Sequence, residues 1–237
     1  MNFLKKIRTI IKWMVAAFLG STILSVVALR FIPVYFTPLM FIRLAEQKAG
    51  GKELKLHHKW IPLKEMSPDL PVAVMASEDQ RFLTHHGFDY NAIEKAALRN
   101  MKHDGKRKHG ASTISQQTAK NVFLWPGRTW LRKGLEAYFT VLIELTWSKQ
   151  RIMEVYLNSI EMGDGIYGAD AVAKRHFKCS AGKLTKVQCA LIAATLPNPR
   201  KYNSAKPSSY MLTRRDKILN EMKFFAEFPA EGEDVKE

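Results

Sequence analysis

One helical pattern occupies the residues Leu131-Arg-Lys-Gly-Leu-Glu-Ala-Tyr-Phe-Thr-Val-Leu-Ile-Glu-Leu-Thr-Trp147. Its apolar side chains fall at helical spacings, at Leu135, Tyr138, Phe139, Leu142, Ile143 and Leu145. This spacing is typical of a helix that turns one face to a core. The stretch therefore predicts a long buried helix, and the segments on either side extend the same kind of structure.

Helix start signals recur along the chain, where a hydroxyl or carboxylate side chain can cap the first turn. The expected caps are Ser67 before Pro68, Asp89, Ser112 and Ser148. Three further helices are expected over residues 169–177, 184–196 and 207–225. Residues 54–61 alternate enough to predict one short strand. The expected fold is one mainly α domain.

An apolar segment near the N-terminus is long enough to span a membrane. No charged residue occurs from Trp13 to Leu29, and apolar residues extend the segment to residues 10–32. Such a length suits a transmembrane helix. Four basic residues precede it, which predicts a cytoplasmic N-terminus. A cleaved signal peptide is the alternative, although the segment exceeds the usual apolar region of such peptides.

The chain length limits the number of domains, and the net charge limits the kinds of partner. The 237 residues leave room for a basic tail (1–9), the membrane helix (10–32), one domain (33–228) and a flexible acidic tail (229–237). Residues 33–66 are amphipathic, and their unusually apolar part at residues 34–44 is expected to form either core or a membrane-facing lobe. Residues 102–110 form a basic loop. The net charge of +15 predicts an anionic partner: nucleic acid, lipid headgroups or a phosphorylated substrate.

Carboxylates supply the first candidate chemistry. Glu78 follows an apolar helix and precedes Asp79, so its partly shielded carboxylate is a candidate general base. Solvated surface acids are the plainer interpretation of such a pair. His85 is expected to orient a neighbour through a hydrogen bond rather than to act as the base. Cys179 and Cys189 are expected to be packing residues, because no metal-ligand pattern includes them.

A polar helix is expected over Thr113 to about Val122, and it suits an anion and sugar hydroxyls. Free N–H groups at its start would attract an anion. The side chains expected to line the site are Ser112, Thr113, Gln116, Gln117, Lys120 and Asn121. An exposed polar helix is the alternative, yet no acidic residue occurs from Gly110 to Arg128.

Cations follow this helix directly. Lys120, Arg128, Arg132 and Lys133 could stabilise a leaving pyrophosphate, or could contact anionic lipid as a surface patch. Glu136 begins an otherwise apolar helix, so its carboxylate needs a partner. That partner could be a basic side chain such as Arg132, or a divalent cation such as Mg²⁺ or Mn²⁺.

Four motifs in order resemble those of the peptidoglycan glycosyltransferases. They are Glu78-Asp79-x-x-Phe82-x-x-His85-x-Gly87-Phe88-Asp89, Gly110-Ala-Ser-Thr-Ile-Ser-Gln-Gln-x-x-Lys-Asn121, Arg132-Lys133-x-x-Glu136 and Arg151-Ile-Met-Glu154-Val-Tyr156-Leu-Asn158. The resemblance covers residues 60–210 and matches the monofunctional biosynthetic form. One departure is Ala111, where many relatives have a second glycine.

The resemblance implies a lysozyme-like helical domain with a smaller membrane-facing lobe, anchored in the inner membrane with its catalytic domain in the periplasm. It implies that lipid II is polymerised with inversion, with undecaprenyl pyrophosphate as the leaving group. Glu78 would be the base and Glu136 the second essential carboxylate. Asp79, the helix residues and the four cations would bind substrate, while Glu154, Tyr156 and Asn158 would be structural. Penicillin-binding transpeptidases and division proteins are the protein partners left open.

Two other classes compete with this interpretation. A glycan-cleaving hydrolase or lytic transglycosylase shares the architecture and needs one glutamate acid, but no pyrophosphate site. A non-catalytic membrane-anchored binding module would explain the positive charge. The basic residues are scattered and are not interleaved with aromatics, so no nucleic-acid partner is expected.

Overall fold

A computed structural model describes residues 2–102 and 111–230 of the chain. The expected loop at 102–110 and the tail from residue 231 lie outside the described residues. The helices are α1 Asn2–Leu29, α2 Pro38–Ala49, α3 Asp69–Glu78, α4 Tyr90–Lys102, α5 Ile114–Phe123, α6 Trp130–Thr146, α7 Lys149–Ser159, α8 Ala169–Val172, α9 Lys186–Thr195 and α10 Ser209–Glu221. The strands are β1 His57–His58, β2 Glu161–Gly163 and β3 Ile166–Tyr167.

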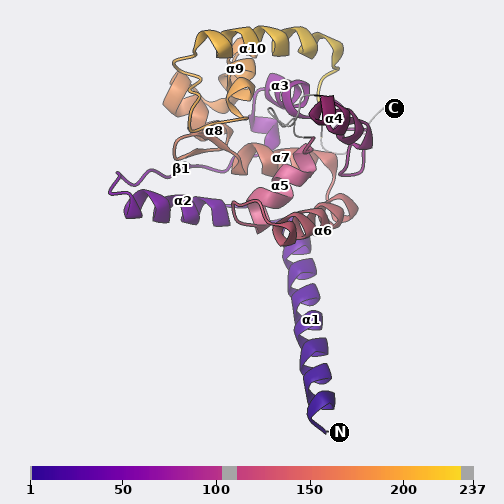
Figure 1. Cartoon of the computed structure of the whole chain (residues 1–237). Coiled ribbons are helices and arrows are strands. Elements are labelled where there is room, and N and C mark those ends of the chain that lie inside the picture. Colours follow the sequence, from indigo (N-terminus) through magenta and orange to yellow (C-terminus); the bar gives the residue numbers. More distant parts are fainter. Residues whose placement is uncertain (1, 103–110, 231–237) are drawn as a thin grey trace.

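Helix α1 projects from the domain as a long single rod (Figure 1). The helix Phe3–Leu29 contains an apolar window long enough to cross a membrane, and almost none of this window is covered by the rest of the protein. Helix α1 itself begins at Asn2, so the basic residues before residue 10 lie in its first turns, and it ends at Leu29. Its exposure distinguishes it from a core helix of similar composition.

The C-terminal end of α1 is fastened to α6 and α7. The Trp147 indole N–H donates to the Val26 carbonyl at 2.8 Å. The Arg151 guanidinium donates to the Leu29 carbonyl at 2.9 Å and to the Ile32 carbonyl at 2.7 Å. These bonds satisfy carbonyl groups that the end of a helix leaves without partners. The anchor and the domain are thereby joined without a free linker.

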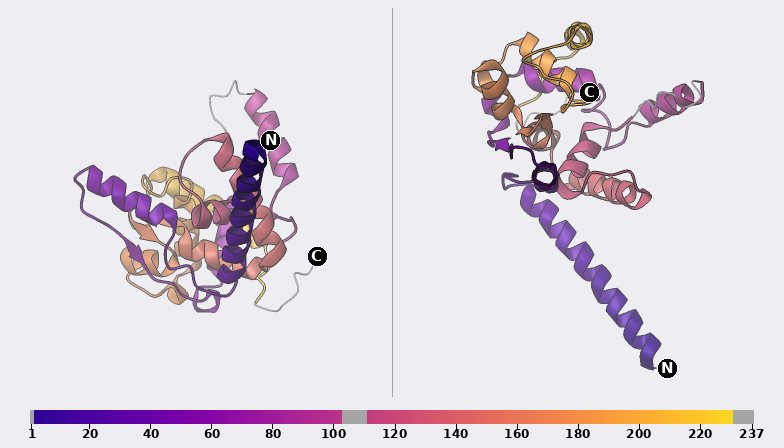
Figure 2. Two further views of the ribbon diagram at one scale, coloured as in Figure 1. Left: turned by 90° about the horizontal axis from the view of Figure 1, so that it is seen from below. Right: turned by 60° about the vertical axis from the view of Figure 1, so that its left-hand side comes forward.

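The core of the domain surrounds α3 and α9. Every residue from Leu70 to Ala76 is buried in α3, as is every residue from Cys189 to Thr195 in α9. Helices that are apolar on all sides are stable only inside a protein. Helix α10 covers this pair on one side, while α5 packs between α6 and α7 (Figures 1 and 2). Burial raises the pKa of the Cys189 thiol to about 12, so this cysteine stays protonated and serves packing.

A small sheet closes the domain beside α2. The expected strand at 54–61 is reduced to His57–His58, which pairs in parallel with β3, and β3 pairs antiparallel with β2. The glycines around residue 165 therefore lie in a hairpin between β2 and β3. Gly168 follows it with φ of 79°, and a side chain there would meet the Asn158 carbonyl. Glycine is required at this position because that backbone conformation strains other residues.

Two expected helix features differ in the structure. Helix α3 begins after Pro68, and the Ser67 side chain does not cap it. Helix α6 buries Phe139 and Ile143 but leaves Leu145 77% exposed, so it is not buried all round. Together with α2 it lies at the end of the domain from which α1 leaves (Figure 1). Exposed Phe36, Phe41, Trp130 and Leu131 belong to the same end, which suits contact with a lipid surface.

Candidate active site

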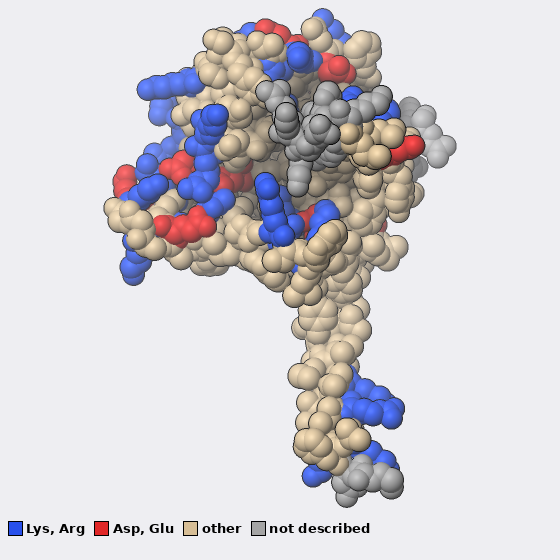
Figure 3. Space-filling view, in the orientation of Figure 1, with Lys and Arg blue, Asp and Glu red and all other residues tan. Residues whose placement is uncertain are grey.

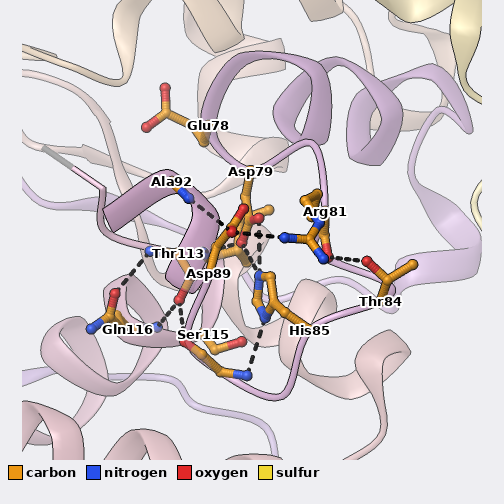
Figure 4. A network of polar contacts seen from close by, with 12 residues as sticks. Glu78, Asp79, Arg81, Thr84, His85, Asp89, Ala92, Thr113, Ser115 and Gln116 are labelled. Carbon is orange, nitrogen blue, oxygen red and sulfur yellow. Dashed lines mark hydrogen bonds and ion pairs between the residues drawn. The ribbon is translucent and has the colours of Figure 1, made fainter. Parts of the chain in front are cut away.

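Glu78 is the last residue of α3 and points its carboxylate away from the buried network beneath it (Figure 4). Its side chain is 14% exposed. Oε1 accepts from the Ser77 hydroxyl at 3.0 Å, and Oε2 accepts from the Gln117 amide at 3.3 Å. Arg214 of α10 approaches Oε1 at 3.4 Å. A partly shielded carboxylate held from two sides is suited to accept a proton from a bound hydroxyl.

Asp79 turns in the opposite direction and is buried (Figure 4). Its carboxylate accepts from His85 Nε2 at 2.9 Å and from the Ile114 backbone N–H at 2.9 Å. His85 Nδ1 accepts from the Gly87 N–H at 3.1 Å, so the ring proton is on Nε2. Asp79 thus fixes the start of α5, and the expectation that it binds substrate is not met by this geometry. His85 orients a neighbour, as expected.

The cap of α5 is Thr113 rather than the expected Ser112. The Thr113 hydroxyl accepts from the Gln116 N–H, and the Gln116 side chain accepts from the Thr113 N–H. Thr113 also donates to the Gly87 carbonyl at 2.7 Å. Thr113 and Gln116 are buried and committed to this cap, while Ser112 is exposed. The N–H groups of Ile114, Gln116 and Gln117 at the start of α5 are therefore already paired within the protein, and the expectation of free N–H groups for an anion is not met at these three positions.

Lys120 lies on α5, one helical turn beyond Gln117, whereas Arg132 and Lys133 lie on α6 and Arg128 lies in the segment between the two helices. Lys120 is largely buried, whereas Arg128 and Lys133 are exposed. Arg132 and Lys133 both bind the Glu136 carboxylate, each at 2.5 Å. Figure 3 shows basic side chains along the lower edge of a hollow in this face. Three of the expected cations and Glu136 thus form one cluster, which we call the cation cluster: Lys120, Arg132, Lys133 and Glu136.

Lys120 connects the cation cluster with Glu78. Burial lowers the pKa of Lys120, and the neighbouring Glu136 carboxylate opposes that shift. Arg132 and Lys133 lower the pKa further, and Glu78 is close enough to raise it. No hydrogen bond to the Lys120 ammonium occurs among residues 2–102 and 111–230. A partly desolvated cation without a direct partner is suited to bind an anionic ligand.

Glu136 does not suit a divalent cation. Both carboxylate oxygens are taken by positively charged side chains, which repel a second cation. Within the described residues, no group of three or more His, Cys, Asp or Glu side chains could hold a metal ion. Glu136 therefore positions Arg132 and Lys133, which is the salt-bridge alternative considered from the sequence.

Glu154, Tyr156 and Asn158, which were expected to be structural, make contacts that hold other segments of the chain in place. Asn158 is fully buried, and its amide bonds both the N–H and the carbonyl of Ile61 at 3.0 and 2.9 Å. Glu154 accepts from the Leu63 N–H at 3.0 Å. The buried Tyr156 hydroxyl donates to Gln117 at 3.3 Å. These side chains hold the segment before α3 and support the helix that carries Gln117. Asn121 is also buried in α5.

Arg214 is the site residue that sequence reasoning missed. Its Nη2 donates to the Ser77 hydroxyl at 3.0 Å as well as approaching Glu78. Glu144 and Lys149 were also missed: they pair at 2.8 Å beneath α5, and Glu144 accepts from Ser115. A helix with basic residues gives no signal of which surface it packs against. Only the packing of α10 on α3 brings Arg214 to this carboxylate.

The fold and the site define a membrane-anchored enzyme with a shielded carboxylate beside a cation cluster. The family described as Transglycosylase matches residues 47–223. Proteins named "Biosynthetic peptidoglycan transglycosylase" are similar over most of the chain. One from Bacteroides thetaiotaomicron is 59% identical over 95% of this chain and 90% of its own. One from Bdellovibrio bacteriovorus is 53% identical over 90% and 86%. One from Caulobacter vibrioides is 52% identical over 84% and 83%.

The chain therefore belongs to the transglycosylase family. This result confirms the family resemblance carried by the four motifs. The mainly α, lysozyme-like domain preceded by one apolar membrane helix is confirmed as well. The chain is an enzyme of glycosyl transfer, and the non-catalytic alternative falls away.

Proposed function

We propose that this protein polymerises lipid II into linear β-1,4 glycan strands of peptidoglycan. The observation that carries the proposal is the placement of Glu78, which accepts from Gln117, close to Lys120, one turn further along α5. It joins a proton acceptor to a cation cluster on one face. The names of the similar proteins support peptidoglycan as the product.

The reaction is a single displacement. Glu78 accepts the proton of the 4-hydroxyl of the incoming lipid II disaccharide, and that oxygen forms a bond to C1 of the growing strand. The bond from C1 to the undecaprenyl pyrophosphate breaks, so the configuration at C1 inverts and no covalent enzyme intermediate forms. The leaving pyrophosphate takes up negative charge, which Lys120, Arg128, Arg132 and Lys133 offset.

Glu136 acts through its cationic partners. By binding Arg132 and Lys133 it fixes two charges that would otherwise repel each other. No step of the proposed reaction passes through a metal ion. Helix α1 holds the domain at the inner membrane, with the basic N-terminus in the cytoplasm and the catalytic domain in the periplasm.

The decisive experiment is polymerisation of labelled lipid II by wild type, Glu78→Gln and Glu136→Gln. The exposed Glu65→Gln is the matched control. Glu78→Gln should lose at least about a hundredfold in rate, as loss of a general base does, with an unchanged melting temperature. Near-normal polymerisation by Glu78→Gln would remove this residue from the mechanism. Cleavage of isolated glycan without use of lipid II would favour the hydrolase alternative.

A further inference from the structure

Two tyrosines form a stacked pair on the surface beside the site. The rings of Tyr202, in the turn before α10, and Tyr210, in its first turn, have centroids 5.4 Å apart and planes inclined by 26°. Tyr210 is 53% exposed. The ammonium of Lys201 lies 5.8 Å from the Tyr202 ring centroid. Tyr202 also borders a pocket of about 350 Å³ with His176 and Arg200. The pair thus offers an aromatic surface edged with cations.

Tyr210 lies one helical turn before Arg214 on α10. Residues four apart share a helix face, and one turn spans about 6 Å along the axis. Arg214 approaches Glu78 Oε1 at 3.4 Å. Tyr210 and the guanidinium that reaches the candidate base therefore lie on one face of α10, one turn apart.

The tyrosine pair and the cation cluster are linked to Glu78 through different helices, α10 and α5. Gln117 holds Oε2 of Glu78, and Lys120 follows Gln117 by one turn of α5. Arg214 reaches Oε1, and Tyr210 precedes it by one turn of α10. Figure 1 shows α10 above α3, α5 below it, and α1 leaving at the lower end. Tyr210 therefore lies on the helix at the end of the domain opposite α1, and Tyr202 stacks on it.

The position of the two tyrosines determines which part of the substrate can reach them. In the proposed function both substrates keep a pyrophosphate and lipid at the membrane, so only sugars remote from the lipid reach α10. The faces of pyranose rings carry C–H groups that pack on exposed aromatic rings, and a tyrosine hydroxyl can add a hydrogen bond. We propose that Tyr202 and Tyr210 bind sugar rings of the growing glycan strand and retain it between transfers. This inference rests on the proposed function.

The test uses the detergent-solubilised full chain and has two readouts. The first is binding of soluble chitohexaose, a lipid-free β-1,4 amino-sugar oligomer, followed by saturation-transfer NMR. The second is the length of the glycan made from labelled lipid II. Tyr210→Ala should weaken chitohexaose binding about two- to tenfold, the range expected for one aromatic contact, and should shorten the strands. Tyr210→Trp should retain both properties, and the exposed Phe224→Ala is the control.

The two readouts separate failure of this inference from failure of the proposed function. If Glu78→Gln still binds chitohexaose, and binds it about two- to tenfold more weakly when Tyr210→Ala is added, the tyrosine pair binds sugar independently of catalysis. If Tyr210→Ala makes strands of wild-type length and binds the oligosaccharide as the wild type does, the inference about the tyrosine pair is overturned. The proposed polymerisation of lipid II is then unaffected. A wild-type chain that cannot use lipid II would instead refute the proposed function, whatever the tyrosines bind.

Discussion

The Arg214 guanidinium lies 3.4 Å from Glu78 Oε1 and joins α10 to the end of α3. Arg214 also donates to Ser77 at 3.0 Å, and Ser77 in turn donates to the same Glu78 oxygen at 3.0 Å. Gln117 holds the other oxygen. The candidate base is therefore fixed by three side chains from two other helices and its own neighbour, which limits the directions from which a hydroxyl can approach.

Replacing Arg214 by alanine should lower kcat for lipid II polymerisation by about tenfold to a hundredfold, because a displaced base loses its alignment. The KM for lipid II should change much less, since Arg214 acts on Glu78 and not on the pyrophosphate. Steady-state kinetics with labelled lipid II measures both constants. Arg215→Ala is the control, because Arg215 pairs with Asp216 and not with Glu78. Equal losses in the two variants would refute a positioning role for Arg214.

Lys120 provides a test in which stability and activity move in opposite directions. Burial lowers the pKa of Lys120, so the folded state binds this proton less tightly than the unfolded state. Wild-type stability should therefore rise with pH between the lowered pKa and the ordinary lysine value near 10.4. Lys120→Met removes the free-energy cost of keeping a charged ammonium in a partly buried place. The variant should therefore match or exceed the wild-type melting temperature at pH 7 while losing at least about tenfold in activity.

The pH dependence of the melting temperature tests whether a gain in Lys120→Met comes from the removal of a buried charge. Any gain in melting temperature from Lys120→Met should shrink as pH rises through the lowered pKa of Lys120, because the wild-type side chain then becomes neutral. Calorimetry of both proteins from pH 7 to pH 10 measures this trend. Lys133→Met, at an exposed neighbouring cation, is the control. A melting temperature that falls together with activity in Lys120→Met would indicate a structural lysine.

Local patterns predicted the helices well and the tertiary partners poorly. The apolar spacings of α6 and the hydroxyl cap of α7 at Ser148 are confirmed, because both depend on residues a few positions apart. The cap of α5 was placed one residue early, since Ser112 and Thr113 carry the same hydroxyl chemistry. Asp79 completes that cap from another segment, and no pattern near Asp79 encodes this contact.

Predictions for the site also succeeded where they depended on the motifs and failed where they depended on contacts between distant segments. The motifs brought Glu78, Gln117 and Lys120 together correctly, because α5 packs against the end of α3 and both motifs lie at that contact. Arg214 could not be placed, since its role depends on how α10 returns over α3 after more than a hundred intervening residues. The exposed side of α6 was also missed. An apolar face that meets lipid has the same sequence pattern as one that meets a core.

Asp79→Asn should destabilise the protein rather than remove a substrate contact. The carboxylate accepts from His85 and from the Ile114 N–H, and bonds to a charged group contribute about 1.5–3 kcal/mol each. Asparagine keeps one acceptor oxygen, so the loss of one such bond should lower the melting temperature of a chain of this size by about 3–12 °C. Differential scanning calorimetry measures the change, with the exposed Asp216→Asn as control. An unchanged melting temperature with a raised KM would return Asp79 to the substrate site.

Asn158→Ala should show that the segment before α3 is held in place by one buried amide. The Asn158 side chain is fully buried and bonds the N–H and carbonyl of Ile61 and the carbonyl of Glu154. Alanine leaves the Ile61 groups buried without these partners, which costs about 2–4 kcal/mol. Denaturant unfolding followed by circular dichroism measures this cost, and the exposed Asn91→Ala should cost much less. Because Asn158 does not contact Glu78, activity per folded molecule should stay near that of the wild type. A specific activity that falls while stability is retained would show instead that Asn158 acts in the reaction.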